Sequence, residues 1–106
     1  MEFLIEIEVR LPPQLTSEER AQLIAAERVR GEELAAQGIL RAIWRVPGRF
    51  ANRAIWSVPD ATQLHEAIAS LPSWPYLDVQ VTPLAQHPLG PHCLGLPAGL
   101  AIEQKD

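Results

Sequence analysis

ILRAIWRVPGRFANRAIWSV, residues 39–58, carries the strongest structural signal in this chain. Two apolar runs, Ile39 to Val46 and Phe50 to Val58, are rich in the β-branched and aromatic residues that favour strands. Pro47-Gly48 lies between them, and this dipeptide suits the two central positions of a type II turn. The stretch therefore predicts a β-hairpin.

The segments at the two ends of the domain also have strand character. Residues 1–11 alternate apolar with charged side chains, and Pro12-Pro13 ends that run. Tyr76 to Val81 alternates in the same way, with Leu77, Val79 and Val81 expected to point inward. We predict one strand in each segment.

Two helices are predicted between these strands. The first runs from Thr16 to about Gln37, because Thr16 and Glu19 form a capping box and Gly38 suits the residue after a helix end. The second is capped by Asp60 and continues to Leu71, where Pro72 stops it.

The resulting order, β-α-β-β-α-β, predicts an α+β fold of the ferredoxin-like type. Its four-stranded antiparallel sheet would carry both helices on one face and leave the other uncovered. Trp44 and Trp56 occupy sheet positions, so we expect a partner subunit to cover this face, as in a dimeric α/β barrel-type assembly. We assign residues 1–83 to the domain and residues 84–106, rich in Pro, Gly and Leu, to an extended C-terminal arm that packs on a neighbour.

The composition of the 106 residues restricts the class of protein. Its length suits one domain, and a net charge of −4 without a basic run argues against nucleic-acid binding. No apolar run approaches the length of about 20 residues that a membrane span needs. No signal peptide is apparent, and a single cysteine, Cys93, suits a reducing compartment, so we expect a cytoplasmic protein.

Glu27 is the principal candidate for a catalytic residue. At about 100° per residue it falls within the apolar stripe of the first helix, with Gly31 leaving space one turn later. A carboxylate in such a place is costly unless it is paired, and it suits a general base. The alternative is a helix-edge carboxylate paired with Arg20 or Arg30. The stripe is formed by Leu23, Ile24, Leu34 and Ala35.

Several segments resemble the muconolactone isomerase family in order and spacing, from Met1 to about His87. They are LRAIWRVPGRFAN (40–52), LHE (64–66), LPSWPYLD (71–78) and His87-Pro88. The resemblance implies a cofactor-independent enzyme whose dimers assemble into a decamer. It also implies conversion of muconolactone to 3-oxoadipate enol-lactone in the catechol branch of aromatic breakdown, and Glu27 matches the glutamate of the family's first helix.

The chain departs from that family pattern at three positions. Ile24 stands where a lysine is common, Arg49 where a histidine is common, and Phe50 where a tyrosine is common. Loss of the lysine removes a cation that would hold the substrate or stabilise an enolate. Two alternatives to the muconolactone activity therefore remain. One is an enzyme acting on a substituted or different lactone, including dehalogenation, and the other is a non-catalytic ligand-binding homologue.

The remaining candidate site residues are substrate contacts. Arg45 and Arg49 could clamp a carboxylate in bidentate fashion, or could be solvated or subunit-bridging charges. Asn52 could donate to an oxyanion, or could be structural. The apolar candidates, for which ordinary packing is the alternative, are Ile24, Trp44, Phe50 and Trp56.

His65 is expected to be structural. His87, His92 and Cys93 lack the spacing of a zinc site, so no metal is expected.

Overall fold

The computed structural model describes residues 1–93 of the chain. Short 3₁₀ turns follow α2 (η1, Trp74–Tyr76) and β4 (η2, Gly90–His92). The principal elements are β1 (Glu2–Val9), α1 (Ser17–Ala36), β2 (Leu40–Arg45), β3 (Ala51–Ser57), α2 (Ala61–Ala69) and β4 (Leu77–Leu84).

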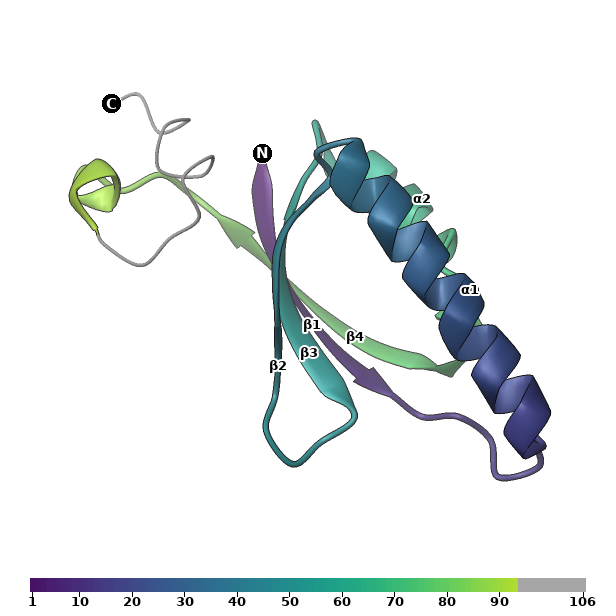
Figure 1. Cartoon of the computed structure of the whole chain (residues 1–106). Coiled ribbons are helices and arrows are strands. Elements are labelled where there is room, and N and C mark those ends of the chain that lie inside the picture. Colours follow the sequence, from purple (N-terminus) through teal and green to yellow (C-terminus); the bar gives the residue numbers. More distant parts are fainter. Residues whose placement is uncertain (94–106) are drawn as a thin grey trace.

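The four strands form one antiparallel sheet in the order β2-β3-β1-β4. Both helices cover the same face of this sheet, and the described residues leave the other face open (Figure 1). The predicted ferredoxin-like arrangement is therefore confirmed. Within residues 1–93, no helix has both the length and the apolarity that a membrane span requires.

The turn and cap residues form the local structures that the sequence predicted. The Thr16 side chain accepts from the Glu19 N–H, and the Glu19 carboxylate accepts from the Thr16 N–H, which lowers the pKa of Glu19. Gly38 and Gly48 both have positive φ, at 77° and 78°, as a helix C′ position and the third position of a type II turn require.

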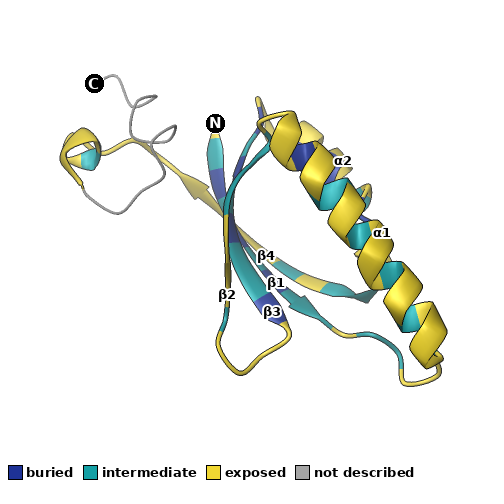
Figure 2. Cartoon of the chain, in the orientation of Figure 1, coloured by how far each residue is buried: buried dark blue, intermediate teal, exposed yellow. Residues whose placement is uncertain are grey.

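The hydrophobic core lies between the sheet and the two helices, where Figure 2 shows the buried residues. Burying each large apolar side chain contributes about 1.5–3 kcal/mol to folding. Leu34 is the buried residue of α1, while α2 contributes three buried residues to the same core. The core includes Phe3, Ile5, Leu34, Trp56, Leu64 and Ile68.

The buried stripe of α1 is narrower than the sequence predicted. Leu34 is fully buried and Leu23 is half-buried, but Ile24 is 49% exposed and Ala35 is exposed. A single row of side chains on this helix faces the sheet, so residues one position to the side of that row reach solvent. Glu27 belongs to the row and is half-buried.

Strand β4 ends three residues later than predicted. It continues through Pro83 to Leu84, which pair with Phe3 and Glu2 of β1. Proline is tolerated there because β4 is an edge strand whose outer side needs no ladder hydrogen bond. The chain from β4 to η2 then projects away from the sheet (Figure 1). Most of the predicted arm, residues 94–106, lies outside the described residues.

Candidate functional site

Glu27 is held at the sheet-facing side of α1 by the turn that follows α2. Its Oε1 accepts a hydrogen bond from the backbone N–H of Ser73 at 3.0 Å. Arg30, one of the two expected partners, instead donates to Ser70 Oγ at 2.9 Å and pairs with Glu33 at 3.1 Å. Within residues 1–93, a neutral backbone amide therefore orients the Glu27 carboxylate. Arg30 does not compensate the negative charge of Glu27.

A cavity of about 140 Å³ lies beside Glu27, and we call it the inner hollow. Most of its wall is aliphatic or aromatic, and three side chains bring polar atoms to it. Such a combination of an apolar wall with few polar groups is typical of small-molecule sites. The inner hollow is lined by Ile7, Val9, Leu11, Leu23, Ile24, Glu27, Phe50, Asn52 and Ser73.

Two of the polar groups in the inner hollow have no partner. Asn52 Oδ1 and Ser73 Oγ are buried and make no hydrogen bond with the described residues. Buried polar atoms are nearly always satisfied in folded proteins. Two unpartnered atoms beside a carboxylate therefore indicate a place where a polar ligand completes the hydrogen bonding.

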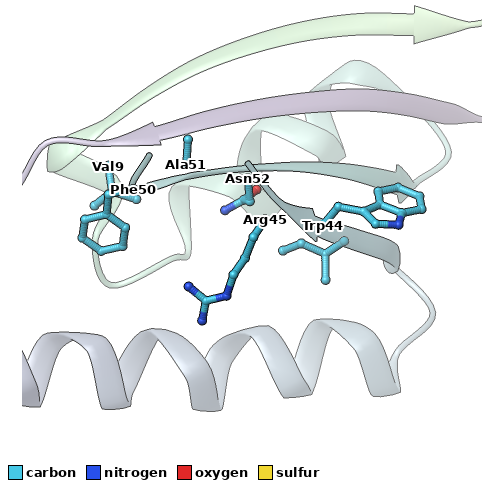
Figure 3. Close-up of a pocket in the computed structure, with 7 residues that line it drawn as sticks. Val9, Trp44, Arg45, Phe50, Ala51 and Asn52 are labelled. Atoms are coloured by element: carbon cyan, nitrogen blue, oxygen red, sulfur yellow. The ribbon is translucent and has the colours of Figure 1, made fainter. Parts of the chain in front are cut away.

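A second cavity, of about 410 Å³, adjoins the first, and we call it the outer hollow. Figure 3 shows the Arg45 side chain extending from the strand edge toward α1. Within the described part of the chain, Arg45 has no hydrogen bond or ion pair. The outer hollow is lined by Val9, Ile43, Trp44, Arg45, Phe50, Ala51 and Asn52.

The two hollows share three wall residues, Val9, Phe50 and Asn52. A carboxylate thus lies in one compartment and a guanidinium in the next. The arrangement fits a ligand that carries an anionic group for Arg45 and a transferable proton for Glu27.

The structure brings together six of the eight predicted site residues. Arg49 and Trp56 lie away from the others. Trp56 packs in the core, only 3% exposed. The six that line the two hollows are Ile24, Glu27, Trp44, Arg45, Phe50 and Asn52.

Arg49 belongs to a charged cluster on the open face of the sheet. Its guanidinium pairs with Glu8, and this hydrogen bond lowers the pKa of the Glu8 carboxyl. Arg10 bridges Glu8 and Asp78, at 2.9 and 3.5 Å. Because β1 residues alternate between faces, Glu8 points to the face opposite to the core residue Ile7.

Ser73 is a site residue that the sequence prediction missed. It lies between Pro72 and the short turn η1, where a serine suggests a helix cap, yet its side chain makes no cap hydrogen bond. The only available signal was its place within residues 71–78, one of the segments that resemble the isomerase family. Gly31, expected to leave space beside Glu27, lines neither hollow, although a Cβ there would meet nothing within 4 Å.

The described residues include side chains of the types that bind metal ions. Among residues 1–93, no three His, Cys, Asp or Glu side chains are placed to hold an ion. His65 packs edge-on against the Trp74 ring, with centroids 5.7 Å apart.

A ferredoxin-like domain with a carboxylate in a small, mostly apolar cavity is typical of proteins that bind small molecules. Comparison with known proteins narrows this class to a family of isomerases. Residues 1–89 match the family described as muconolactone delta-isomerase, and the chain belongs to that family.

Named relatives agree with the family match. The chain is 36% identical to muconolactone Delta-isomerase 2 of Acinetobacter lwoffii, over 82% of this chain and 91% of the relative. It is 34% identical to muconolactone Delta-isomerase of Rhodococcus opacus, over 80% and 91% of the two chains.

Solved structures agree with the fold. A muconolactone isomerase crystal structure at 3.3 Å resolution superposes with a TM-score of 0.78 at 34% identity, covering 83% of this chain and 92% of the other. The 5-chloro-2-hydroxyhydroquinone dehydrochlorinase of Burkholderia phenoliruptrix AC1100 superposes with a TM-score of 0.63 at 18% identity. The match covers 82% of this chain and 96% of the other. This second likeness concerns the fold alone.

Proposed function

We propose that this protein is a cofactor-independent lactone isomerase that converts muconolactone to 3-oxoadipate enol-lactone in the catechol branch of the β-ketoadipate pathway. The observation that carries the proposal is the inner hollow, where Glu27 meets two unpartnered polar atoms within an apolar wall. Membership of the muconolactone delta-isomerase family supplies the substrate class.

Glu27 is the proposed base. Its carboxylate takes the proton from the saturated ring carbon of the butenolide, and the electron pair spreads through the ring to the lactone carbonyl oxygen. Glu27 then returns the proton two carbons away, which moves the double bond without loss of any atom. A positioned general base of this kind contributes about 10²–10⁴-fold to a rate.

Arg45 is the proposed anchor for the substrate's side-chain carboxylate. Its guanidinium extends into the space between β2 and α1 (Figure 3) and has no partner among residues 1–93. The Asn52 amide, shared by both hollows, offers a donor to the ring oxygen, while Trp44, Phe50 and Ile24 form the apolar wall. Arg49 and Trp56 are not assigned substrate contacts in this proposal.

A substituted or less polar lactone is the second candidate substrate, with dehalogenation as a related reaction. One observation favours it: the wall position one turn before Glu27 is Ile24, an aliphatic side chain, where the family resemblance implies a lysine. An apolar wall at this place favours a ring substituent such as methyl or chlorine over a second anionic group.

We also propose that the subunit assembles through its open sheet face, as dimers and then a decamer, in the cytoplasm. Support for assembly comes from the large apolar side chains that stay exposed on one subunit, among them Trp44 at 48% and Leu84 at 39%. A face with alternating charges, such as the Glu6–Arg53 pair at 2.9 Å, also suits contact with a second copy. The single cysteine supports a reducing compartment.

The direct test is turnover by the purified protein. Muconolactone, its methyl and chloro derivatives, and a neutral butenolide are compared, and formation of the enol-lactone is followed at high enzyme concentration. We expect catalysed isomerisation of muconolactone. No turnover of muconolactone above background would reject the proposed activity, and turnover of only the substituted lactones would establish the second candidate.

A further inference from the structure

Ser73 has an unusual environment for a polar residue. It is only 4% exposed, and it is the one polar residue among residues 1–93 that is classed as buried. Its backbone groups are both used: the N–H donates to Glu27 Oε1 at 3.0 Å, and the C=O accepts from the Tyr76 N–H at 2.8 Å. Its hydroxyl alone makes no hydrogen bond with the described residues.

The fold does not need this hydroxyl. An alanine at the same position would keep both backbone hydrogen bonds and would remove the desolvation cost of an unsatisfied buried oxygen. Ser70, three residues earlier, shows the contrasting case. Its Oγ accepts from Arg30 Nε at 2.9 Å and donates to the Ala67 carbonyl at 2.6 Å, so that hydroxyl joins the two helices.

Ser73 and Glu27 both line the inner hollow, and the Ser73 N–H orients the Glu27 carboxylate. The Ser73 hydroxyl thus belongs to a residue of the cavity wall and has no partner among residues 1–93. The unpartnered atom of Asn52 is Oδ1, an acceptor, whereas a serine hydroxyl can donate. Ser73 therefore supplies what a developing negative charge beside Glu27 requires.

We propose that Ser73 is a further catalytic residue, whose hydroxyl donates a hydrogen bond to the lactone carbonyl oxygen of the substrate. The proposal rests on the proposed isomerase function. When Glu27 takes the ring proton, the electron pair moves to that oxygen, and the hydroxyl stabilises the charge without giving up its proton. When the proton returns to the ring, the charge on the oxygen disappears. One residue thus holds the base by its N–H and the oxyanion by its side chain.

The test compares Ser73→Ala with the matched control Ser70→Ala. Removal of an oxyanion donor costs about 10²-fold or more in kcat, so we expect a loss of this order for Ser73→Ala, with an unfolding temperature equal to or above that of the wild type. Ser70→Ala should show the opposite pattern, a lower unfolding temperature with a nearly unchanged kcat. A wild-type kcat in Ser73→Ala would overturn the inference.

A binding measurement separates this inference from the proposed function. Calorimetric titration with muconolactone and with an unsubstituted butenolide is made on the wild type and on Ser73→Ala. If the wild type binds a lactone without isomerising it, the proposed activity fails, and weaker binding by Ser73→Ala still supports the Ser73 contact. Equal affinities in an inactive wild type, or no binding of either probe by it, would overturn that contact.

Discussion

Glu27 on α1 and Ser73 after α2 are joined by a 3.0 Å hydrogen bond between residues that are 46 positions apart in the chain. Only Oε1 is engaged in this way among the described residues, so the carboxylate is oriented while Oε2 remains available for a proton. The bond also brings the helix carboxylate next to a buried, unpartnered hydroxyl. This contact connects the fold to the proposed chemistry.

Glu27→Gln should remove the base and keep the local structure, since the amide oxygen can still accept from the Ser73 N–H. We expect kcat for muconolactone to fall by about 10²-fold or more, with an unchanged circular dichroism spectrum. Glu32→Gln is the matched control, because Glu32 lies on the same helix with a 69% exposed side chain. Near-normal turnover by Glu27→Gln would reject Glu27 as the base.

Arg45→Gln should weaken substrate binding more than it slows the chemical step, because the substrate carboxylate is held equally before and during proton transfer. We expect KM for muconolactone to rise by about 10-fold or more, as loss of a charged hydrogen bond predicts. Arg49→Gln should leave KM unchanged, since Arg49 pairs with Glu8 on the other face of the sheet. If the effects of these two variants were reversed, Arg49 would be the anchor.

Ile24→Lys should change which lactone the site prefers. Ile24 lines the inner hollow one turn before Glu27, and its 49% exposure leaves room for a longer side chain. The new cation should attract an anionic substrate, so the ratio of kcat/KM for muconolactone to that for a neutral butenolide should rise by about 5-fold or more. An unchanged ratio would show that this wall position does not set specificity.

Glu8 should make stability depend on pH under acidic conditions. The Arg49 hydrogen bond lowers the pKa of Glu8 in the folded protein, so its contribution is present above the ordinary glutamate range, about 4.3, and is lost as pH falls through the lower folded value. Glu8→Gln should therefore lower the unfolding temperature at pH 7 and much less at pH 3. The exposed Glu66→Gln serves as the control. A Glu8→Gln effect of the same size at both pH values would contradict this expectation.

The open sheet face should hold the assembly together. Light scattering on the wild type should give a mass several times that of the 11.7 kDa subunit, up to the ten subunits of a decamer. Ile55 lies on this face, on the side of β3 opposite to the core residues Ala54 and Trp56. Ile55→Glu should reduce the measured mass, because a charge would be buried at the interface. A monomeric wild type would reject the proposed assembly.

Local sequence signals were sufficient for the elements of the fold. The Thr16-Glu19 capping box and the glycine at position 48 act within a few residues, so their consequences can be read without knowledge of the rest of the chain. The end of β4 was missed, because Pro83 is a strand breaker in isolation and is tolerated only where the strand lies at an edge. The exposure of Ile24 was missed because helix periodicity gives the direction of a side chain but not the width of the contact.

The sequence by itself determined the order of strands and helices, and it singled out Glu27, because periodicity and capping are properties of neighbouring residues. Only the tertiary structure decided the composition of the site. It separated Arg49 from Arg45, although they are four residues apart, because a turn lies between them and each reaches a different side of the sheet. It also brought Ser73 to Glu27, a contact between distant segments that depends on how α1 and α2 pack on one sheet.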